Sequence, residues 1–343
     1  MKTIKNLAFF IFIALVTLLA SELICRMYGL KPYTENPVKF DYKPTLPGKF
    51  DTVLGHSLIP GYFSITKNDT FTYHATHNNQ CRRISKPEDQ VADYAGCNKV
   101  IFLGCSFTYG DCLEDSLTHP YLLQQLFRQN DIHLSVENWG VGGYCPSHFY
   151  LLSKDILKDT TVKYVVINYS SIQDERTICG RNWRKSLVKY TNQRKYQKSV
   201  NVPYFTLENG APALKYKPLS YSFLPLQKNM ALVEYIDQLF CKFENRNATA
   251  ITKQVLKLTI DSLRQKGVHV ILTSITGDDR SNETVRSMQK DGYTTLLYGI
   301  NTGEDYYNFN PIDGHPNYRA NKIFADSLYS RISAQESNGS ALR

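Results

Sequence analysis

The chain has 343 residues, a length that fits one large α/β domain with additions. Hydrophobic residues make up 42% and charged residues 21%, which excludes a disordered chain. The net charge of +9 is compatible with binding to nucleic acid, anionic lipid or acidic polymers. The sequence contains no zinc-finger spacing, no basic heptad helix and no aromatic RNA-binding run, so we expect no nucleic-acid partner.

The first 29 residues are typical of an export signal. Lys2 and Lys5 precede an apolar run from Leu7 to Ala20, and no convincing small-residue cleavage site follows. We therefore predict that residues 1–29 remain as a single-pass anchor in the cytoplasmic membrane, with the body on the extracytoplasmic (periplasmic) side. The alternative is a buried N-terminal helix.

The eight cysteines include no C-x-x-C pair, so the sequence predicts no zinc site, and we expect neither a metal nor a cofactor. In an exported protein some of these cysteines can form disulfides. Cys81 and Cys97 would close a loop just before the core begins, and Cys112 and Cys145 flank the candidate site described below. The connectivity does not follow from the sequence.

Residues 30–96 are rich in Pro, Lys, Thr and Asn and have weak periodicity, with a turn at Pro60-Gly61. We predict an N-terminal extension that packs on the core. The main domain is expected at 97–335, where a short apolar run at 100–103 predicts a buried parallel strand that ends at Gly104.

Strands and helices alternate in the rest of this domain. The further elements expected are a helix from Thr118, a strand at 134–138, a helix at 147–158, a strand at 162–168, a helix at 251–266, a strand at 269–274 and a helix at 317–332. This alternation predicts a parallel sheet with helices on both faces, and ligands bind such sheets at the carboxyl ends of the strands.

The stretch at 177–250 lacks this alternation and is interpreted as an insert. Basic residues gather in it between Arg181 and Lys198. Two interpretations stay open for them, a solvated basic surface or a contact with an anionic glycan or lipid headgroups.

A serine follows the first core strand, in the segment that runs from Gly104 through Ser106 to Gly110. A serine on a turn beyond a buried strand can expose its hydroxyl at the edge of the sheet. The segment is not the G-x-S-x-G elbow, because Thr108 occupies the second glycine position, and it is not a phosphate-binding loop. Taken alone, such a motif is usually only a turn.

Asp313-Gly314-His315 directly precedes the last predicted helix. A serine hydroxyl needs a base to remove its proton, histidine does so near neutral pH, and a carboxylate can orient the imidazole. The alternative is that His315 starts the helix and Asp313 belongs to a turn.

Together these motifs resemble the SGNH/GDSL hydrolase family over about 99–332, with the insert unaccounted for. The blocks that carry the resemblance are Gly104-Cys105-Ser106-Phe107 for Gly-Asp-Ser-Leu, Asn138-Trp139-Gly140-Val141-Gly142-Gly143 for the second block, Ser171-Ile172-Gln173-Asp174 for Gly-x-Asn-Asp, and Asp313-Gly314-His315 for the terminal Asp/His block. Residues 54–61 also resemble the N-terminal region of membrane-anchored bacterial members.

The resemblance implies a three-layer α/β/α sandwich with a parallel central sheet. It implies Ser106 as nucleophile and His315 and Asp313 as its base and orienting carboxylate. The oxyanion hole would consist of the backbone N–H groups of Ser106 and Gly143 and the side chain of Gln173, which replaces asparagine. The family's aspartate usually lies three residues before the histidine, whereas Asp313 lies two before His315.

The implied function is that of an esterase, deacetylase or acyltransferase acting on a small acyl ester. The expected partner is an acylated small molecule or polysaccharide. The alternative is a catalytically weak or inactive protein of the same fold that binds glycan or assists the assembly of envelope polysaccharide.

Overall fold

The computed structural model describes residues 2–34, 38–193 and 200–340. Its centre is a five-stranded sheet with the order β12-β11-β8-β6-β7, in which all neighbouring strands are parallel. The strands are Asn98–Leu103 (β6), Leu134–Asn138 (β7), Val162–Tyr169 (β8), His269–Ser274 (β11) and Thr295–Leu297 (β12). In chain order this is the flavodoxin-like arrangement 2-1-3-4-5, whose direction of winding reverses between β6 and β8.

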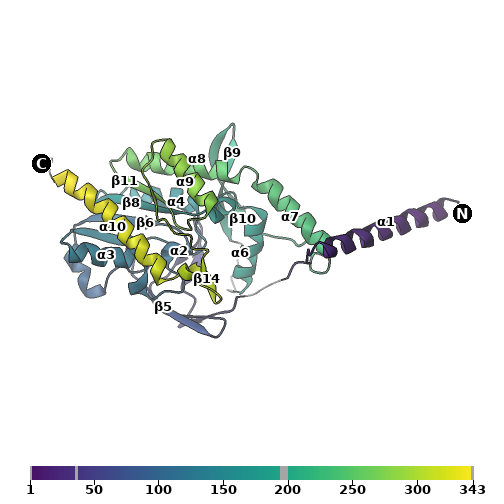
Figure 1. The fold of residues 1–343 in the computed structure, drawn as a ribbon, viewed down its shortest axis with the longest axis horizontal. Coiled ribbons are helices and arrows are strands. Elements are labelled where there is room, and N and C mark those ends of the chain that lie inside the picture. The colour runs from purple at the N-terminus through teal and green to yellow at the C-terminus, as the bar shows by residue number, and fades with distance from the viewer. Residues whose placement is uncertain (1, 35–37, 194–199, 341–343) are drawn as a thin grey trace.

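Helices cover both faces of this sheet (Figure 1). One face packs against His119–Gln129 (α3) and Tyr318–Ser340 (α10), and the other against Pro146–Ile156 (α4), Ala248–Arg264 (α8) and Asp279–Lys290 (α9). Side chains alternate along β6, so that Val100 and Phe102 face α3 and α10 while Ile101 and Leu103 face the opposite layer. The predicted three-layer α/β/α sandwich is confirmed.

The predicted core strands and helices all occur, with bounds within a few residues of those expected, except that α10 extends to Ser340 where the predicted helix ends at residue 332. The sequence did not predict α9 and β12, which complete the far edge of the sheet. The four buried side chains of α9 include only two apolar ones, those of Val285 and Met288. Its apolar periodicity is therefore weak, although the helix is regular.

The extension contributes two small antiparallel units. Phe40–Lys43 (β1), Gly61–Lys67 (β4) and Phe71–His77 (β5) form one, and Gly48–Asp51 (β2) pairs with Gly55–Leu58 (β3) in the other. Arg83 ties the extension to the segment that follows β6. Its buried guanidinium donates hydrogen bonds to the carbonyl oxygens of Tyr109 and Gly110, at 3.0 and 2.6 Å.

The stretch after β8 holds helices and a hairpin. Its elements are Ile172–Thr177 (α5), Arg181–Gln193 (α6), Asn201–Glu208 (β9), Ala211–Pro218 (β10) and Ala231–Asn245 (α7). The β9–β10 hairpin packs near α4, α5 and α8. This part of the chain also contacts the extension, because β3 packs against β9 and Phe50 packs against Val200 and Val202.

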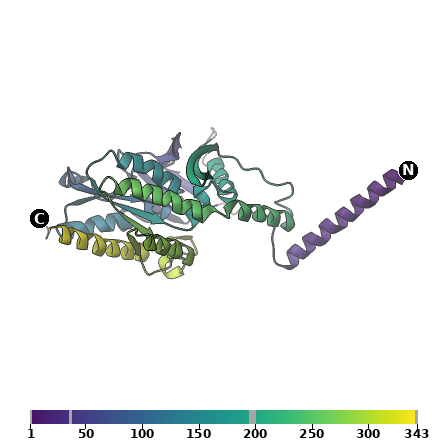
Figure 2. The ribbon, with the colours of Figure 1, turned by 90° about the horizontal axis from the view of Figure 1, so that it is seen from above.

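The N-terminal helix Lys2–Met27 (α1) projects away from the body (Figure 2). The part from Ile4 to Met27 is long and apolar enough to cross a membrane, and its most apolar window of 18 residues has a mean hydropathy of 2.5. None of its most apolar window is buried in the structure. The alternative of a buried N-terminal helix is therefore wrong.

All eight cysteines are free, and each of them lies in the described part of the chain. The pairings considered for Cys81 with Cys97 and for Cys112 with Cys145 are not formed. Burial raises the pKa of the Cys112 thiol to about 12, although nearby Lys67 opposes this shift, so the thiol stays protonated at neutral pH.

Candidate active site

Ser106 lies at the first position of a short helix, Ser106–Tyr109 (α2), directly beyond β6. Gly104 permits this close turn, because a Cβ atom there would lie only 1.9 Å from Oγ1 of Thr108. At the first position of a helix the backbone N–H has no partner within the helix. The turn therefore presents both the hydroxyl and the N–H of Ser106, and Ser106 lines a cavity at the carboxyl edge of the sheet.

His315 and Asp313 lie on Asp313–Pro316 (β14), which pairs with Asn308–Phe309 (β13) just before α10. The Nε2 atom of His315 lies 2.8 Å from Oγ of Ser106, although 209 positions separate the two residues. Nδ1 of His315 is hydrogen-bonded to Oδ1 of Asp313. The structure thus brings all three predicted residues into one hydrogen-bonded chain.

The short spacing between Asp313 and His315 is compatible with this geometry. Oδ1 of Asp313 also accepts a hydrogen bond of 2.8 Å from the backbone N–H of His315. Such a bond from an aspartate to the backbone two residues on forms a local turn, which holds the carboxylate beside the imidazole. With Nδ1–H donating to the carboxylate, Nε2 is left to accept the proton of Ser106.

Lys67, at the end of β4, holds Asp313 from its other side. Its Nζ atom donates to Oδ2 of Asp313 at 2.9 Å, and the lysine side chain is 1% exposed. Burial would raise the pKa of Asp313, but His315 and Lys67 hold it well below its usual range. Burial would likewise lower the pKa of Lys67, but Asp111, Cys112 and Asp313 raise it. Asp313 is therefore a carboxylate and Lys67 an ammonium ion at neutral pH.

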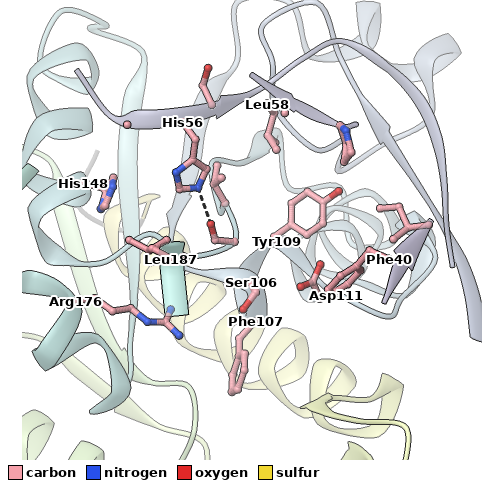
Figure 3. A pocket seen from close by; sticks show the side chains of 18 of the residues that line it. Phe40, His56, Leu58, Ser106, Phe107, Tyr109, Asp111, His148, Arg176 and Leu187 are labelled. Atoms are coloured by element: carbon pink, nitrogen blue, oxygen red, sulfur yellow. Dashed lines mark hydrogen bonds between the residues drawn. The ribbon is translucent and has the colours of Figure 1, made fainter. Parts of the chain in front are cut away.

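Gly143, with a φ of +88°, lies in the glycine-rich turn after β7. His56 on β3 fixes the neighbouring peptide, because its Nε2 atom lies 2.8 Å from the carbonyl oxygen of Gly142. In a trans peptide the C=O and N–H bonds point in opposite directions, so the N–H of Gly143 points away from His56. Figure 3 shows Ser106 and His56 on opposite sides of this bond. Among the described residues, the N–H groups of Ser106 and Gly143 have no hydrogen-bond partner.

The structure does not bring Gln173 to the cavity, which corrects its assignment to the oxyanion hole. Gln173 is fully buried, and its Nε2 atom donates a 3.2 Å hydrogen bond to the carbonyl oxygen of Asn168. Its Oε1 atom has no partner among the described residues. The side chain therefore supports the turn after β8 and provides no donor next to Ser106.

Arg176, one helical turn further along α5, does reach the cavity (Figure 3). Ile172 and Arg176 are four positions apart and line the cavity together, as residues on one face of a helix do. The guanidinium lies over the ring of Trp183, at 4.5 Å from its centroid. Within the described ranges it has no carboxylate partner, and its Nη1 atom is buried without a hydrogen bond. Arg176 is thus a cation available to an anionic group.

The cavity has a volume of about 340 Å³ and Ser106 lies between its two walls. Figure 3 shows Phe40, Tyr109 and Asp111 on one side of Ser106 and Leu187, His148 and Arg176 on the other. One wall comes from the extension and α2 region, and the other from α4 to α6. The size suits a small ligand, since ligand pockets commonly range from about 300 to 1,000 Å³.

Lys67, His56, Asp111 and Arg176 were not predicted as site residues. Asp111 lies 3.6 Å from Nε2 of His315 and accepts a hydrogen bond of 2.9 Å from the Tyr73 hydroxyl. Only His56 lay in a stretch already singled out by its resemblance to anchored family members. The other three carry no local signal, because their partners are distant in the sequence.

Comparison with known proteins gives likeness at the level of structure only. No family model and no curated protein matches the chain. Solved structures that resemble it include the psychrotrophic esterase EstA of Pseudoalteromonas sp., with 11% identity over 70% of this chain and 99% of that one and a TM-score of 0.41.

Two others are a GDSL-like lipase of Bacteroides thetaiotaomicron (13% identity, 73% and 98% covered, TM-score 0.38) and an acetylxylan esterase of Geobacillus stearothermophilus (11% identity, 68% and 94% covered, TM-score 0.39). Such values assign no substrate to this chain. Its chemistry therefore has to follow from its own side chains.

Proposed function

We propose that the protein is a serine-dependent carboxylic-ester hydrolase of the SGNH/GDSL type that acts on a small acyl ester. The observation that carries the proposal is the hydrogen-bonded chain from Ser106 through His315 to Asp313. Ser106 lies near the start of the domain's sequence, and Asp313 and His315 lie near its end. Ser106 contacts His315, which contacts Asp313, and this order activates a serine hydroxyl.

In the first half of the reaction, Oγ of Ser106 attacks the carbonyl carbon of the ester and His315 Nε2 takes its proton. The electron pair of the carbonyl moves to the oxygen, which the N–H groups of Ser106 and Gly143 stabilise. The tetrahedral intermediate then expels the alcohol, whose oxygen takes the proton from His315. Ser106 is left carrying the acyl group.

In the second half, a water molecule gives a proton to His315 and its oxygen attacks the acyl-serine. The intermediate collapses to a carboxylic acid and regenerates Ser106, which recovers its proton from His315. A sugar hydroxyl in place of water would give an acyltransferase. Asp313 stabilises the imidazolium in both halves, and it stays ionised throughout because its pKa is well below the usual range.

The substrate that we propose is an acyl ester, such as an acetyl group, on an envelope or extracellular carbohydrate. The volume of about 340 Å³ supports a small group at Ser106. The anchor proposed for residues 1–29 would hold the enzyme at the periplasmic face of the cytoplasmic membrane, near such polymers, and the exposed apolar helix α1 supports that location.

One observation favours a second candidate, a glycan-binding or envelope-assembly protein with little activity. Gln173 lies outside the cavity, which leaves two backbone N–H groups as oxyanion donors. Losing one such donor typically costs about 3–4 kcal/mol in the transition state. Arg176 is the one further donor from α5 that lines the cavity, among the described residues.

The test is covalent labelling of the full chain in detergent by a fluorophosphonate probe, together with turnover of an aryl acetate. We expect labelling and turnover in the wild type and neither in Ser106→Ala. The rate of labelling should be roughly 10³-fold lower in His315→Ala, as expected for loss of a triad base.

Matched controls use the same residue types, a serine from the same cavity and a histidine outside it. Ser57 also lines the cavity, and His269 is exposed at the start of β11. Ser57→Ala and His269→Ala should both label like the wild type. A folded wild type that neither labels nor turns over an aryl acetate would favour the binding protein.

A further inference from the structure

Helix α7 (Ala231–Asn245) buries a polar face and exposes an apolar one. Glu234, Asp237 and Cys241 are buried against the body. The opposite face forms a stripe with the helical spacing i, i+3, i+4 and i+7. The stripe consists of Ile236, Leu239, Phe240 and Phe243, which are 38%, 45%, 52% and 64% exposed. A soluble helix normally has the reverse arrangement, so this stripe indicates an apolar partner.

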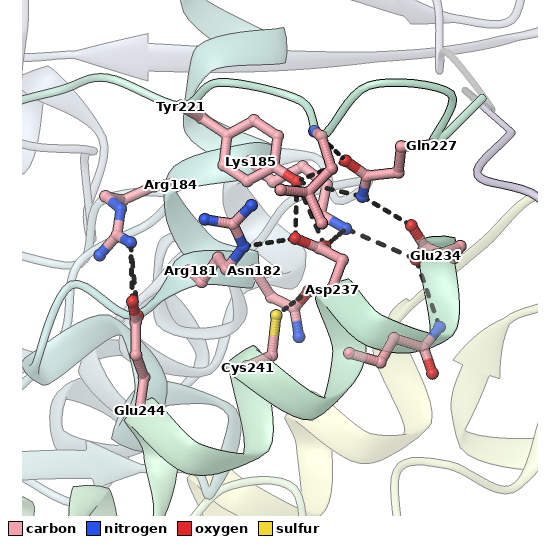
Figure 4. Close-up of polar contacts among 12 residues, drawn as sticks. Arg181, Asn182, Arg184, Lys185, Tyr221, Gln227, Glu234, Asp237, Cys241 and Glu244 are labelled. Atoms are coloured by element: carbon pink, nitrogen blue, oxygen red, sulfur yellow. Dashed lines mark hydrogen bonds and ion pairs between the residues drawn. The ribbon is translucent and has the colours of Figure 1, made fainter. Parts of the chain in front are cut away.

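The buried polar face fixes α7 in this orientation (Figure 4). Asp237 accepts a 2.7 Å hydrogen bond from Nζ of Lys185 and is also paired with Arg181. Glu234 accepts a 2.7 Å hydrogen bond from Gln227. Rotating the helix to bury the apolar stripe would leave these charges without partners, which is strongly unfavourable.

These contacts exclude both interpretations for two of the basic residues between Arg181 and Lys198. Arg181 and Lys185 are neither a solvated surface nor a contact for external anions, because they pair with α7 inside the protein. The side chains of Lys189, Arg194, Lys195 and Lys198 lie outside the described part of the chain.

The N-terminus of α7 is attached to the base of α1. The carboxylate of Glu22 accepts hydrogen bonds from the backbone N–H groups of Ala231 and Leu232, each at 2.9 Å. Arg26 donates to the carbonyl oxygen of Asn229 at 3.1 Å. In both views α7 meets α1 at an angle and does not continue along its axis (Figures 1 and 2). A bilayer crossed by α1 would therefore have its surface close to α7.

Cationic side chains flank the apolar stripe. Lys242 on α7 and Arg246 directly after its end are exposed, and the guanidinium of Arg246 lies 4.4 Å from the ring centroid of Phe243. An exposed apolar stripe bordered by Lys and Arg is the pattern of helices that lie in the membrane interface. Long basic side chains there reach the headgroups while their stems stay beside apolar surface.

We propose that α7 is an interfacial membrane helix, whose stripe enters the outer leaflet beside the point where α1 leaves the bilayer. The protein is then attached to the membrane at two places, the spanning helix and α7. This inference rests on the proposed membrane anchor and is independent of the ester chemistry.

Fluorescence quenching by brominated lipid tests this inference on the full chain. Phe240→Trp places a reporter in the stripe, and Gln238→Trp is the matched control on the same helix, outside the stripe. Both variants are reconstituted in vesicles of brominated phosphatidylcholine and phosphatidylglycerol and compared with unbrominated vesicles. The emission of the parent protein, from Trp139 and Trp183, is subtracted.

We expect bromine to reduce the added emission of Phe240→Trp at least about twofold more than that of Gln238→Trp, as for a helix at the boundary of headgroups and acyl chains. A Leu15→Trp variant reports separately on insertion of α1. Quenching of Leu15→Trp with equal, weak quenching of the two α7 variants would overturn the inference while leaving the anchor intact.

Two other outcomes would also overturn it. Absence of quenching at Leu15→Trp would remove the anchor on which the inference rests. An unquenched Phe240→Trp in particles that contain two copies of the chain would assign the stripe to a dimer interface. None of these results depends on labelling of Ser106, so failure here is distinguishable from failure of the proposed esterase.

Discussion

The ammonium group of Lys67 and the carboxylate of Asp313 lie 2.9 Å apart, although 246 positions separate them in the chain. Lys67 comes from the N-terminal extension and Asp313 from the loop before the last helix. The pair therefore links a segment outside the central sheet to the group that orients His315. The extension contributes to the site as well as covering it.

Replacing Lys67 by methionine should lower both stability and activity. The substitution leaves Asp313 as a largely buried carboxylate with one partner fewer, and breaking such a pair costs up to about 3–5 kcal/mol. We expect kcat to fall roughly 10-fold or more with little change in KM, because the carboxylate loses a positioning contact. Urea unfolding and steady-state kinetics measure the two effects. Lys39→Met, which removes an exposed pair with Asp69, should change neither.

Asp313→Asn tests which residue orients His315. An amide cannot stabilise the imidazolium and favours the wrong tautomer, so kcat should fall by roughly 10³–10⁴-fold while the fold is retained. Ile312 occupies the position where the family usually has its aspartate, but it is 43% exposed and lies outside the cavity. Adding Ile312→Asp to Asp313→Asn should not restore activity. Recovery in the double variant would contradict the assignment of Asp313.

His56→Phe should impair the oxyanion hole without touching the triad. The variant loses the hydrogen bond to the carbonyl oxygen of Gly142, so the neighbouring N–H of Gly143 is no longer held in place. We expect kcat for an aryl acetate to fall by up to about 10²-fold, approaching the effect of a lost oxyanion donor, with KM nearly unchanged. His74→Phe is the control, since His74 pairs with Glu114 on the surface. Unchanged kcat in His56→Phe would argue against Gly143 as a donor.

Substitution of Gln173 should mainly lower stability, whereas substitution of Arg176 should mainly lower activity. Gln173→Ala should leave kcat/KM within about twofold but reduce the free energy of unfolding by about 1–3 kcal/mol, because the side chain is buried and bonded to Asn168.

Arg176→Gln should keep stability and reduce kcat/KM by roughly 10-fold or more, because the cavity loses its unpaired cation. Comparing a neutral aryl acetate with a carboxylated one separates the two roles of Arg176. A loss confined to the carboxylated ester indicates substrate binding, and an equal loss indicates oxyanion stabilisation.

Stability should fall between pH 6.5 and pH 4. Burial lowers the pKa of His77 to about 4, of His119 to about 4 and of His148 to about 3 from 6.5. Below pH 6.5 the unfolded chain takes up these protons and the folded protein does not, so the folded state loses up to about 1.4 kcal/mol per pH unit for each histidine. Above pH 6.5 the three histidines are neutral in both the folded and the unfolded state, so they no longer lower the free energy of unfolding. Urea unfolding at several pH values measures the slope.

A single substitution checks that slope. His77→Gln should reduce the proton uptake on unfolding at pH 5 by about one. The wild-type protein is the reference. An equal slope in His77→Gln and in the wild type would mean that other groups, such as the carboxylates, govern the acid side.

The sheet followed from local patterns in the sequence. The apolar run at 100–103 ending at Gly104, and the later strands with their intervening amphipathic helices, are each defined by neighbours in the chain. Helix α9 was not predicted because serine and threonine supply half of its buried side chains, which weakens its apolar periodicity. The regular layers were therefore predictable where apolar periodicity is strong, and only there.

The site was predictable only in part. Ser106 and His315 stand in recognisable motifs, whereas Lys67 and Arg176 do not. Gln173 shows the limit of a motif match, because a helix turns by about 100° for each residue. The face of α5 that lines the cavity therefore carries Ile172 and Arg176, and Gln173 points into the interior. Rotation of this kind depends on tertiary packing that a sequence motif does not encode.

The cavity draws its reacting groups and its walls from different parts of the chain. Ser106 lies in the turn after β6 and His315 in the β13–β14 hairpin, whereas Phe40 comes from the extension and Leu187 from α6. Substitutions in those outer segments can alter the shape of the cavity without displacing the groups that make and break bonds. Selectivity and reactivity can therefore diverge independently during evolution, and a redesign of the preferred ester can begin in the walls.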